Sequence, residues 1–319
     1  MIVTVTMNAA LDRTLTVPSF QLGHRHRASE KLTLAGGKGI TVARALKTLG
    51  VPVVATGLAG GRNGRRILEE LAEEAILNDF VRIEDESRTS TAVADPTTGT
   101  FTEVIEWGPL VLEAELEVLR EKIEYLARSA ELVVFAGTLP RGVADDFYAD
   151  AIRALNRRGV LAILDSEGEP LREGLDAEPF LVSPNRIEAE AVVGQEFSED
   201  GDFIDGLERL SDLGARNALI THERGCFASV RAERGQSKRF HAEAPVREPI
   251  SSVGSGAVLL AGFIAAWLDQ ASPEDALRRA VAAGAASTRS VGAGRFDPED
   301  VGRMLPDVRV VELSAVAQA

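Results

Sequence analysis

Cysteine, long apolar runs and basic charge are all scarce in this 319-residue sequence. The single cysteine, Cys226, can form neither an internal disulfide nor a cysteine metal cluster, so we expect a cytoplasmic protein. The longest apolar run, residues 257–268, is too short to span a bilayer and predicts a buried helix. Residues 1–12 lack the basic segment and long apolar core of a signal peptide, and they predict a strand that runs into a loop.

The shortage of basic charge limits the partners that the chain can bind. Its 35 basic residues face 49 acidic residues, which gives a formal net charge of −14 and a pI near 4.9. Such a field repels a nucleic-acid backbone and an anionic membrane surface, so we expect neither as a partner. A small anion can bind only where local basic side chains or backbone N–H groups outweigh the global field.

The rest of the composition is that of a globular protein, with 45% apolar and 26% charged residues and no internal repeat. The clearest helix is expected over residues 111–128, where leucines and an isoleucine recur at helical spacing. Short β-branched runs alternate with such helical patterns and predict strands at 53–56, 133–136, 161–164 and 218–221. This alternation predicts an α/β fold with a mostly parallel sheet.

Two stretches, residues 13–34 and 88–106, interrupt the alternation. Each contains two strand patterns with no helix between them, separated by turn signals at Gly23 and at residues 96–99. Strands that follow one another without a helix cannot join a parallel core by crossovers. We therefore predict a small β-sheet that projects from the core as a lid or a dimer surface.

Three glycine-led turns, at residues 36–39, 137–140 and 253–257, stand where strands are expected to end or helices to begin. Unpaired backbone N–H groups at such turns make anion sites, although each turn alone also fits an ordinary helix start or strand end. The first turn is neither a GxxxxGK[ST] phosphate loop nor a GxGxxG dinucleotide turn. The missing GxGxxG after the first strand argues against an NAD-linked dehydrogenase.

Six short motifs follow one another along nearly the whole chain: NAALD at 8–12, GGKGI at 36–40, RTST at 88–91, GTLP at 137–140, LDSEG at 164–168, and SPN at 183–185 with Glu188. In this order they resemble the ribokinase-like (PfkB) family of carbohydrate kinases, most closely its 1-phosphofructokinase and tagatose-6-phosphate kinase branch. The resemblance implies one domain over residues 1–319, a ribokinase-like three-layer α/β/α sandwich with a mostly parallel central sheet. The lid strands, from about 13–34 and 88–106, would be inserted in it.

The resemblance also implies a reaction, the ATP-dependent phosphorylation of a ketohexose phosphate. Fructose 1-phosphate, converted to fructose 1,6-bisphosphate, is the leading substrate, and tagatose 6-phosphate and fructose 6-phosphate are alternatives. Asp12 would accept hydrogen bonds from sugar hydroxyls, with Gly37 and Lys38 beside it; its alternative role is a loop Asx-turn. Thr41, where the family has asparagine, and Thr138 would complete the sugar site.

Three arginines of the lid resemble the cluster that holds the phosphate already on the substrate. Arg25 and Arg27 are one strand period apart and would point to one face, together with Arg88 from the second lid stretch. Guanidinium forks suit phosphate oxygens, although a solvated strand face is the alternative. With Lys38, these residues would gather at one pocket as the local basic site that the acidic chain needs.

The resemblance places the nucleotide on the second half of the chain. Asn185 and Glu188, at positions i and i+3, would organise Mg²⁺ on the ATP phosphates, although the same pair would also serve as a helix capping box. Adenine and ribose would lie between Thr221 with Gly225 and the segment 282–288, which includes Ala283 and Ser287. Gly254, Ser255 and Gly256 would form the anion hole from their backbone N–H groups.

Position 257 departs from the family pattern, because Ala257 stands where the family has the aspartate that acts as the catalytic base. A methyl group cannot accept a proton, so we predict binding of both ligands but very slow transfer. An engineered Asp→Ala knockout of an active kinase is the favoured explanation, since the surrounding residues keep the family form. The alternative is a natural non-catalytic protein that binds sugar phosphate or nucleotide. The exposed edges of the lid also predict a homodimer that pairs lid to lid.

Overall fold

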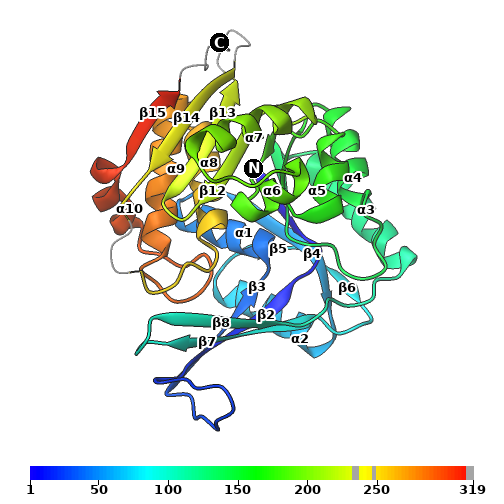
Figure 1. Cartoon of the computed structure of the whole chain (residues 1–319). Helices are drawn as coiled ribbons and strands as arrows, with labels where there is room; N and C mark the ends of the chain where they lie inside the picture. Colours follow the sequence, from blue (N-terminus) through cyan, green and yellow to red (C-terminus); the bar gives the residue numbers. More distant parts are fainter. Residues whose placement is uncertain (232–236, 246–248, 314–319) are drawn as a thin grey trace.

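The structure is a computed structural model that describes residues 1–231, 237–245 and 249–313. A large sheet with strand order β15-β14-β13-β12-β11-β10-β9-β1-β4-β5 runs through the molecule (Figure 1). Its strands are β1 (Ile2–Thr6), β4 (Val53–Gly60), β5 (Leu77–Asn78), β9 (Leu132–Ala136), β10 (Leu161–Asp165), β11 (Leu181–Val182), β12 (Ala218–His222), β13 (Gly225–Arg231), β14 (Ser237–Glu243) and β15 (Arg309–Leu313), and β6 (Val81–Ile83) pairs with β4. Pairs from β5 to β12 are parallel and pairs from β12 to β15 are antiparallel. The four strands predicted for the core are confirmed.

The sheet is buried on both faces, which explains why its strands are continuously apolar. In β9, Leu132 and Val134 belong to one hydrophobic core, while the intervening Val133 and the following Phe135 belong to the other. Successive side chains of a strand point to opposite faces, so one five-residue strand supplies both cores.

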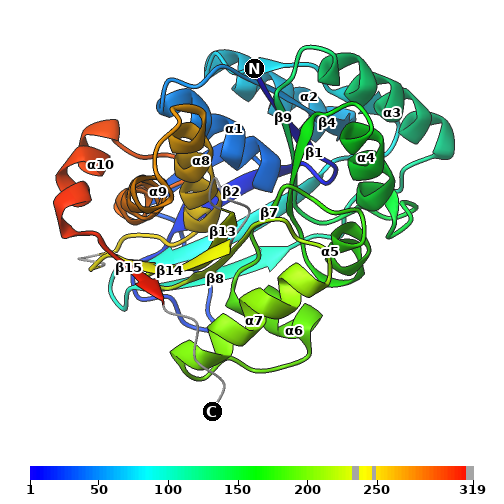
Figure 2. The same ribbon diagram turned by 90° about the horizontal axis from the view of Figure 1, so that it is seen from above.

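Helices cover each face and complete the three layers. One core receives α1 (Lys38–Thr48), α2 (Gly61–Glu73), α8 (Ser255–Leu268) and α9 (Pro273–Ser287), and α10 (Pro298–Met304) packs on α9, followed by the short η1 (Leu305–Asp307). The other core receives α3 (Glu113–Ala127), α4 (Phe147–Asn156), α5 (Gly168–Leu175), α6 (Arg186–Val193) and α7 (Asp200–Asp212). Figure 2 shows α8 and α9 on the side of β13 and β14 opposite to α7.

Two of these helices test specific sequence predictions. The helix expected over residues 111–128 is α3, and Leu116, Leu119 and Ile123 on its inner face are buried. The apolar run 257–268 lies in α8, which is buried along most of its length. Among the described residues, no helix combines the length and apolar character needed to cross a membrane.

The predicted projecting sheet is present, and we call it the lid. It consists of β2 (Ala10–Thr16), β3 (Glu30–Gly36), β7 (Arg88–Asp95) and β8 (Thr100–Ile105) in the order β3-β2-β7-β8, and it lies below the core in Figure 1. Residues 10–12, expected in a loop, form the start of β2 instead. Since β3 runs directly into the turn before α1, the base of the lid adjoins the core.

Arg25 and Arg27 do not lie on a strand. The expectation of a strand face is wrong, because both residues sit exposed in the connection between β2 and β3 (dark blue in Figure 1). The segment 24–27 contains only histidine and arginine, so neither face of a strand there could be buried, and Gly23 with φ 80° turns the chain just before it.

Candidate active site

The three glycine-led turns have the backbone conformation that requires glycine. Gly37 precedes α1 with φ 108°, Gly137 follows β9 with φ 102°, and Gly254 precedes α8 with φ 80°. Other residues adopt these positive angles only at a cost, so the glycines permit abrupt chain reversals at these points. The expected positions of the turns at helix starts and at a strand end are confirmed.

A cavity of about 750 Å³ opens at the start of α8 and at the ends of β10 and β12. Its walls include most residues expected around a nucleotide: Asn185, Glu188, Thr221, Gly225, Gly254, Ser255, Gly256 and Ala257. The first N–H groups of a helix have no partner within it, and Gly254 has no side chain to cap them. The start of α8 therefore presents backbone donors in the wall of the cavity, next to the methyl group of Ala257.

Two residues expected beside the nucleotide do not line this cavity. Ala283 and Ser287 are buried within α9, where the Ser287 hydroxyl donates to the carbonyl oxygen of Gly284 at 2.7 Å. Gly284 and Thr288, each one position further along the helix, lie on the cavity wall. One residue corresponds to about 100° of rotation in a helix, which is enough to exchange the buried face for the open one.

Lys38 belongs to the large cavity and not to the surroundings of Asp12. Its ammonium group donates to Asp165 Oδ1 at 3.0 Å and to Glu188 Oε1 at 2.8 Å, and all three residues line the cavity. Burial alone would lower the pKa of Lys38, but the two carboxylates outweigh it and raise the pKa above its usual value. Sequence analysis gave no role to Asp165, although its place at the end of the buried strand β10 marks it as a site carboxylate.

Asn185 and Glu188 form the predicted capping box of α6. Glu188 Oε2 accepts from the backbone N–H of Asn185 at 2.8 Å, and Asn185 Oδ1 accepts from the backbone N–H of Glu188 at 3.0 Å. The capping role is thereby confirmed. Since the second oxygen of Glu188 faces Lys38 and Asp165, the same box also fixes a buried carboxylate on the cavity wall.

Asp12 lies in a second, narrow cavity under the lid, with a volume of about 20 Å³, lined also by Ser90, Glu103, Ser251 and Ala293 among others. Burial raises the pKa of Asp12 to about 6; Arg88 and Arg44 act to lower it and Glu103 to raise it further. A Cβ on Gly36 would come within 2.0 Å of Asp12 Oδ2, so only glycine at this position leaves room for the carboxylate.

The other residues expected at the sugar site contact the backbone or side chains of neighbouring segments. The Thr138 hydroxyl accepts from the Asn8 side-chain amide at 3.0 Å, and Arg88 points at the Asn8 carbonyl oxygen, with two N–O distances of 3.4 Å. Thr41 is buried, and its hydroxyl donates to the carbonyl oxygen of Gly37 at 3.2 Å.

The four basic residues expected in one pocket are dispersed. Only Arg88 is close enough to Asp12 to act on its charge, while Lys38 lies in the large cavity. The connection that carries Arg25 and Arg27 begins beyond Thr16, about 13 Å along β2 from Asp12.

Residues 251–257 separate the two cavities. Ser251 and Val253 line the cavity of Asp12, whereas Ser252 and residues 254–257 line the large cavity. Molecules bound in the two cavities would therefore meet at this segment.

The sequence of this chain matches a known protein family over most of its length. A model of the pfkB family of carbohydrate kinases matches residues 4–300. The chain belongs to the pfkB family. It is accordingly a phosphotransferase of the sugar-phosphate kinase type, in a family whose members use ATP.

Relatives of this pfkB protein cover almost its full length. A 1-phosphofructokinase of Borreliella burgdorferi is 31% identical over 313 residues, which span 98% of this chain and 99% of the relative. A tagatose-6-phosphate kinase of Staphylococcus epidermidis is 28% identical over 330 aligned positions, spanning 98% and 100%.

Solved structures confirm the ribokinase-like fold of this pfkB protein. Phosphofructokinase-2 of Escherichia coli, in complex with substrates and products, superposes with a TM-score of 0.87 at 26% identity, over 96% of this chain and 98% of that one. The ribokinase of Arabidopsis thaliana, with ribose and ATP, shares the fold at 22% identity and a TM-score of 0.71, over 95% and 98%.

Proposed function

We propose that this protein binds ATP in the large cavity and a ketohexose phosphate beside Asp12, with fructose 1-phosphate as the leading substrate. The cavity of Asp12, of about 20 Å³, has room for about one water molecule, so the lid would have to move away from the core to admit the sugar. The observation that carries the proposal is the position of residues 251–257 between the two cavities. A sugar hydroxyl on one side and the terminal phosphate of ATP on the other would meet there. In-line phosphoryl transfer requires this arrangement, since catalysis depends mainly on positioning and charge stabilisation.

In this proposal the residues of the chain divide the work. Asp12, when ionised, accepts hydrogen bonds from the sugar hydroxyls, and the backbone N–H groups at Gly254, Ser255 and Gly256 hold the transferring phosphoryl group. Arg88 holds the phosphate already on the sugar from within the lid. Arg25 and Arg27 are exposed in the connection beyond the end of β2, so they would contribute less to this phosphate than Arg88 does.

Magnesium fits the donor set on the wall of the large cavity. Asp165 and Glu188 provide hard carboxylate oxygens, which are ligands that Mg²⁺ prefers. In this structure both carboxylates accept hydrogen bonds from the Lys38 ammonium group, and Asn185 lies beside Glu188. With ATP bound, Mg²⁺ would neutralise charge on the phosphate oxygens. Asn185 and Glu188 would orient its water ligands, and Lys38 would compensate for the two buried carboxylates.

Ala257 makes the proposed transfer slow, because it occupies the base position and a methyl group cannot take the proton of the sugar hydroxyl. Ala257 lies on the wall of the large cavity and is 6% exposed. A positioned general base contributes about 10²- to 10⁴-fold to such a reaction. Binding would survive this loss, since the anion hole is made of backbone.

The Ala257→Asp variant tests the proposal through ATP consumption with fructose 1-phosphate, and with tagatose 6-phosphate and fructose 6-phosphate in parallel. A gain of about 10²- to 10⁴-fold is expected. Silence of this variant despite tight binding of both ligands would support the alternative, a non-catalytic sugar-phosphate or nucleotide binder. The control is Ala257→Asn, because it adds similar bulk at the same position without a base. Ala261→Asp, one turn further along α8, would bury a charge in the core and is not a usable control.

We further propose that two copies pair through their lids. The strand β8 forms one edge of the lid, and its residues Val104 and Ile105 are 66% and 58% exposed, as is Trp107 just after it at 88%. An apolar, unpaired edge of this kind favours association. Phosphofructokinase-2 of Escherichia coli has been solved as a tetramer in an inhibited form.

A further inference from the structure

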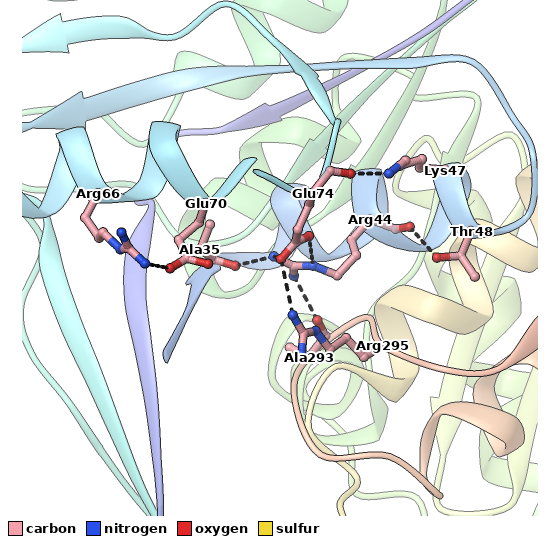
Figure 3. A network of polar contacts seen from close by, with 9 residues as sticks. All are labelled: Ala35, Arg44, Lys47, Thr48, Arg66, Glu70, Glu74, Ala293 and Arg295. Carbon is pink, nitrogen blue, oxygen red and sulfur yellow. Dashed lines mark hydrogen bonds and ion pairs between the residues drawn. The ribbon is translucent and has the colours of Figure 1, made fainter. Parts of the chain in front are cut away.

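The proposed function gives no role to the buried charge of Arg44. Arg44, in the second turn of α1, is 4% exposed, whereas an arginine is normally found at the surface. Its guanidinium group makes four hydrogen bonds to three separate segments (Figure 3). Two go to the Glu74 carboxylate at 2.6 and 3.1 Å, one to the carbonyl oxygen of Ala35 at 2.8 Å and one to that of Ala293 at 2.9 Å.

Stability alone does not explain such a buried pair. Removing two charges from water costs several kcal/mol, and well-packed apolar side chains of the same volume often stabilise a protein as well or better. What an apolar residue cannot do is bind two carbonyl oxygens in a fixed relation. The planar guanidinium group of Arg44 can bind both carbonyl oxygens in this way, because its hydrogen bonds to the Glu74 carboxylate fix its orientation.

The first carbonyl belongs to Ala35, a buried residue one position before a glycine that packs against Asp12. Ala35 lies next to Gly36, whose Cα hydrogens face the Asp12 carboxylate so closely that a Cβ would come within 2.0 Å of it. A displacement of Ala35 would therefore change the space around Asp12.

The second carbonyl belongs to Ala293 in the loop after α9, which packs against the glycine-led turn at Gly254. A Cβ on Gly254 would come within 3.0 Å of Ala293 Cβ, and one on Gly294 within 2.9 Å of the carbonyl oxygen of Thr41. This loop is thus packed between α1 and Gly254, and Ala293 itself lines the cavity of Asp12.

We propose that Arg44 is a positioning residue of the proposed kinase site, which holds the Ala35–Gly36 segment, packed against Asp12, and the Ala293 loop at a fixed separation beside the bound sugar. The inference rests on the proposed function, because it assumes that the sugar phosphate binds beside Asp12. Arg44 also acts on Asp12 electrostatically: its charge helps Arg88 to lower the pKa of Asp12 against burial and Glu103.

The test compares Arg44→Met, Arg44→Lys and, as a matched control, Arg295→Ala. Arg295 contacts the same Glu74 carboxylate at 3.8 Å but is half-exposed at the edge of the network. Calorimetric titration with fructose 1-phosphate and separately with ATP is carried out from pH 5 to pH 8 on each folded variant. Arg44→Met should weaken fructose 1-phosphate binding by roughly 5- to 150-fold and change ATP binding by much less.

The pH profile separates positioning from a merely structural role. Binding of the sugar should fall as the pH drops through the pKa of Asp12, and this midpoint should move upward in Arg44→Met because a positive charge near Asp12 is gone. Arg44→Lys keeps the charge but not the fork, so its midpoint should stay in place while its affinity falls. Arg295→Ala should leave both unchanged.

Three outcomes decide the matter. Equal loss of sugar-phosphate and ATP binding in Arg44→Met, or no loss, overturns the role of Arg44 while leaving the proposed function intact. If Arg44→Met does not fold, a wild-type affinity in Arg44→Lys overturns it in the same way. A wild-type chain that binds ATP but none of the three ketohexose phosphates overturns the proposed function and this inference with it.

Discussion

Replacing Asp12 by asparagine should stabilise the unliganded protein relative to wild type as the pH rises, while it removes sugar-phosphate binding. In the folded chain, burial raises the pKa of Asp12 from 3.8 to about 6. Between these values the folded state binds more protons at Asp12 than the unfolded state, so this residue makes stability fall as the pH increases from about 4 to about 6. The difference corresponds to at most about 3 kcal/mol.

The assay is urea unfolding of wild type and Asp12→Asn at pH 4 and pH 7.5 without ligand. Other carboxylates titrate in the same range, but they are common to both proteins and cancel in the difference. Wild type should lose up to about 3 kcal/mol more than Asp12→Asn between the two pH values.

Asp95 in the same lid provides a control of opposite sign. It accepts hydrogen bonds from the backbone N–H groups of Ser19, Phe20 and Thr97, which outweigh desolvation and lower its pKa to about 2. Its contribution to stability is present above about pH 4 and is lost as the pH falls toward 2, so Asp95→Asn should destabilise at pH 7.5. Parallel pH dependence of wild type and Asp12→Asn would refute the assignment of Asp12 as a buried, reluctantly ionised acceptor.

Two further predictions concern the lid. Arg88→Ala should weaken binding of fructose 1-phosphate by about 1.5–3 kcal/mol and leave the Kd of ATP, measured by calorimetry, unchanged. Changing both Arg25 and Arg27 to alanine should weaken fructose 1-phosphate binding by less in a monomer. If both variants lost the same amount of fructose 1-phosphate binding, the placement of these residues would be wrong. Trp107→Ser with Val104→Ser should shift the mass measured by analytical ultracentrifugation toward the monomer, and an unchanged dimer mass would exclude the lid edge as the interface.

The sequence predicted the features that depend on local pattern. Continuous apolar strands such as 133–136 and the helical spacing in 111–128 are local signals, and the structure contains both elements. The glycine-led turns were equally accessible, because a positive φ at Gly37 or Gly254 is a requirement of the adjacent chain.

The sequence analysis misplaced side chains whose position depends on residues far away in the chain. The family resemblance led us to expect Lys38 beside Asp12, yet the side-chain partners of Lys38 are Asp165 and Glu188, which are 127 and 150 residues away. Ala283 and Ser287 lie in α9, which does line the large cavity, but the packing of this helix determines which of its faces is open. The role of Arg44 required knowledge of Ala293, which is 249 residues away.

The wall between the two cavities has a thermodynamic consequence that is independent of catalysis. Because residues 251–257 line both cavities, a shift of this segment on binding one ligand alters the space offered to the other. Linkage then requires reciprocity: whatever factor the sugar phosphate imposes on the affinity for ATP, ATP imposes on the affinity for the sugar phosphate. A chain with alanine at position 257 would retain this mutual dependence and respond to the joint presence of the two metabolites even when no phosphate moves between them.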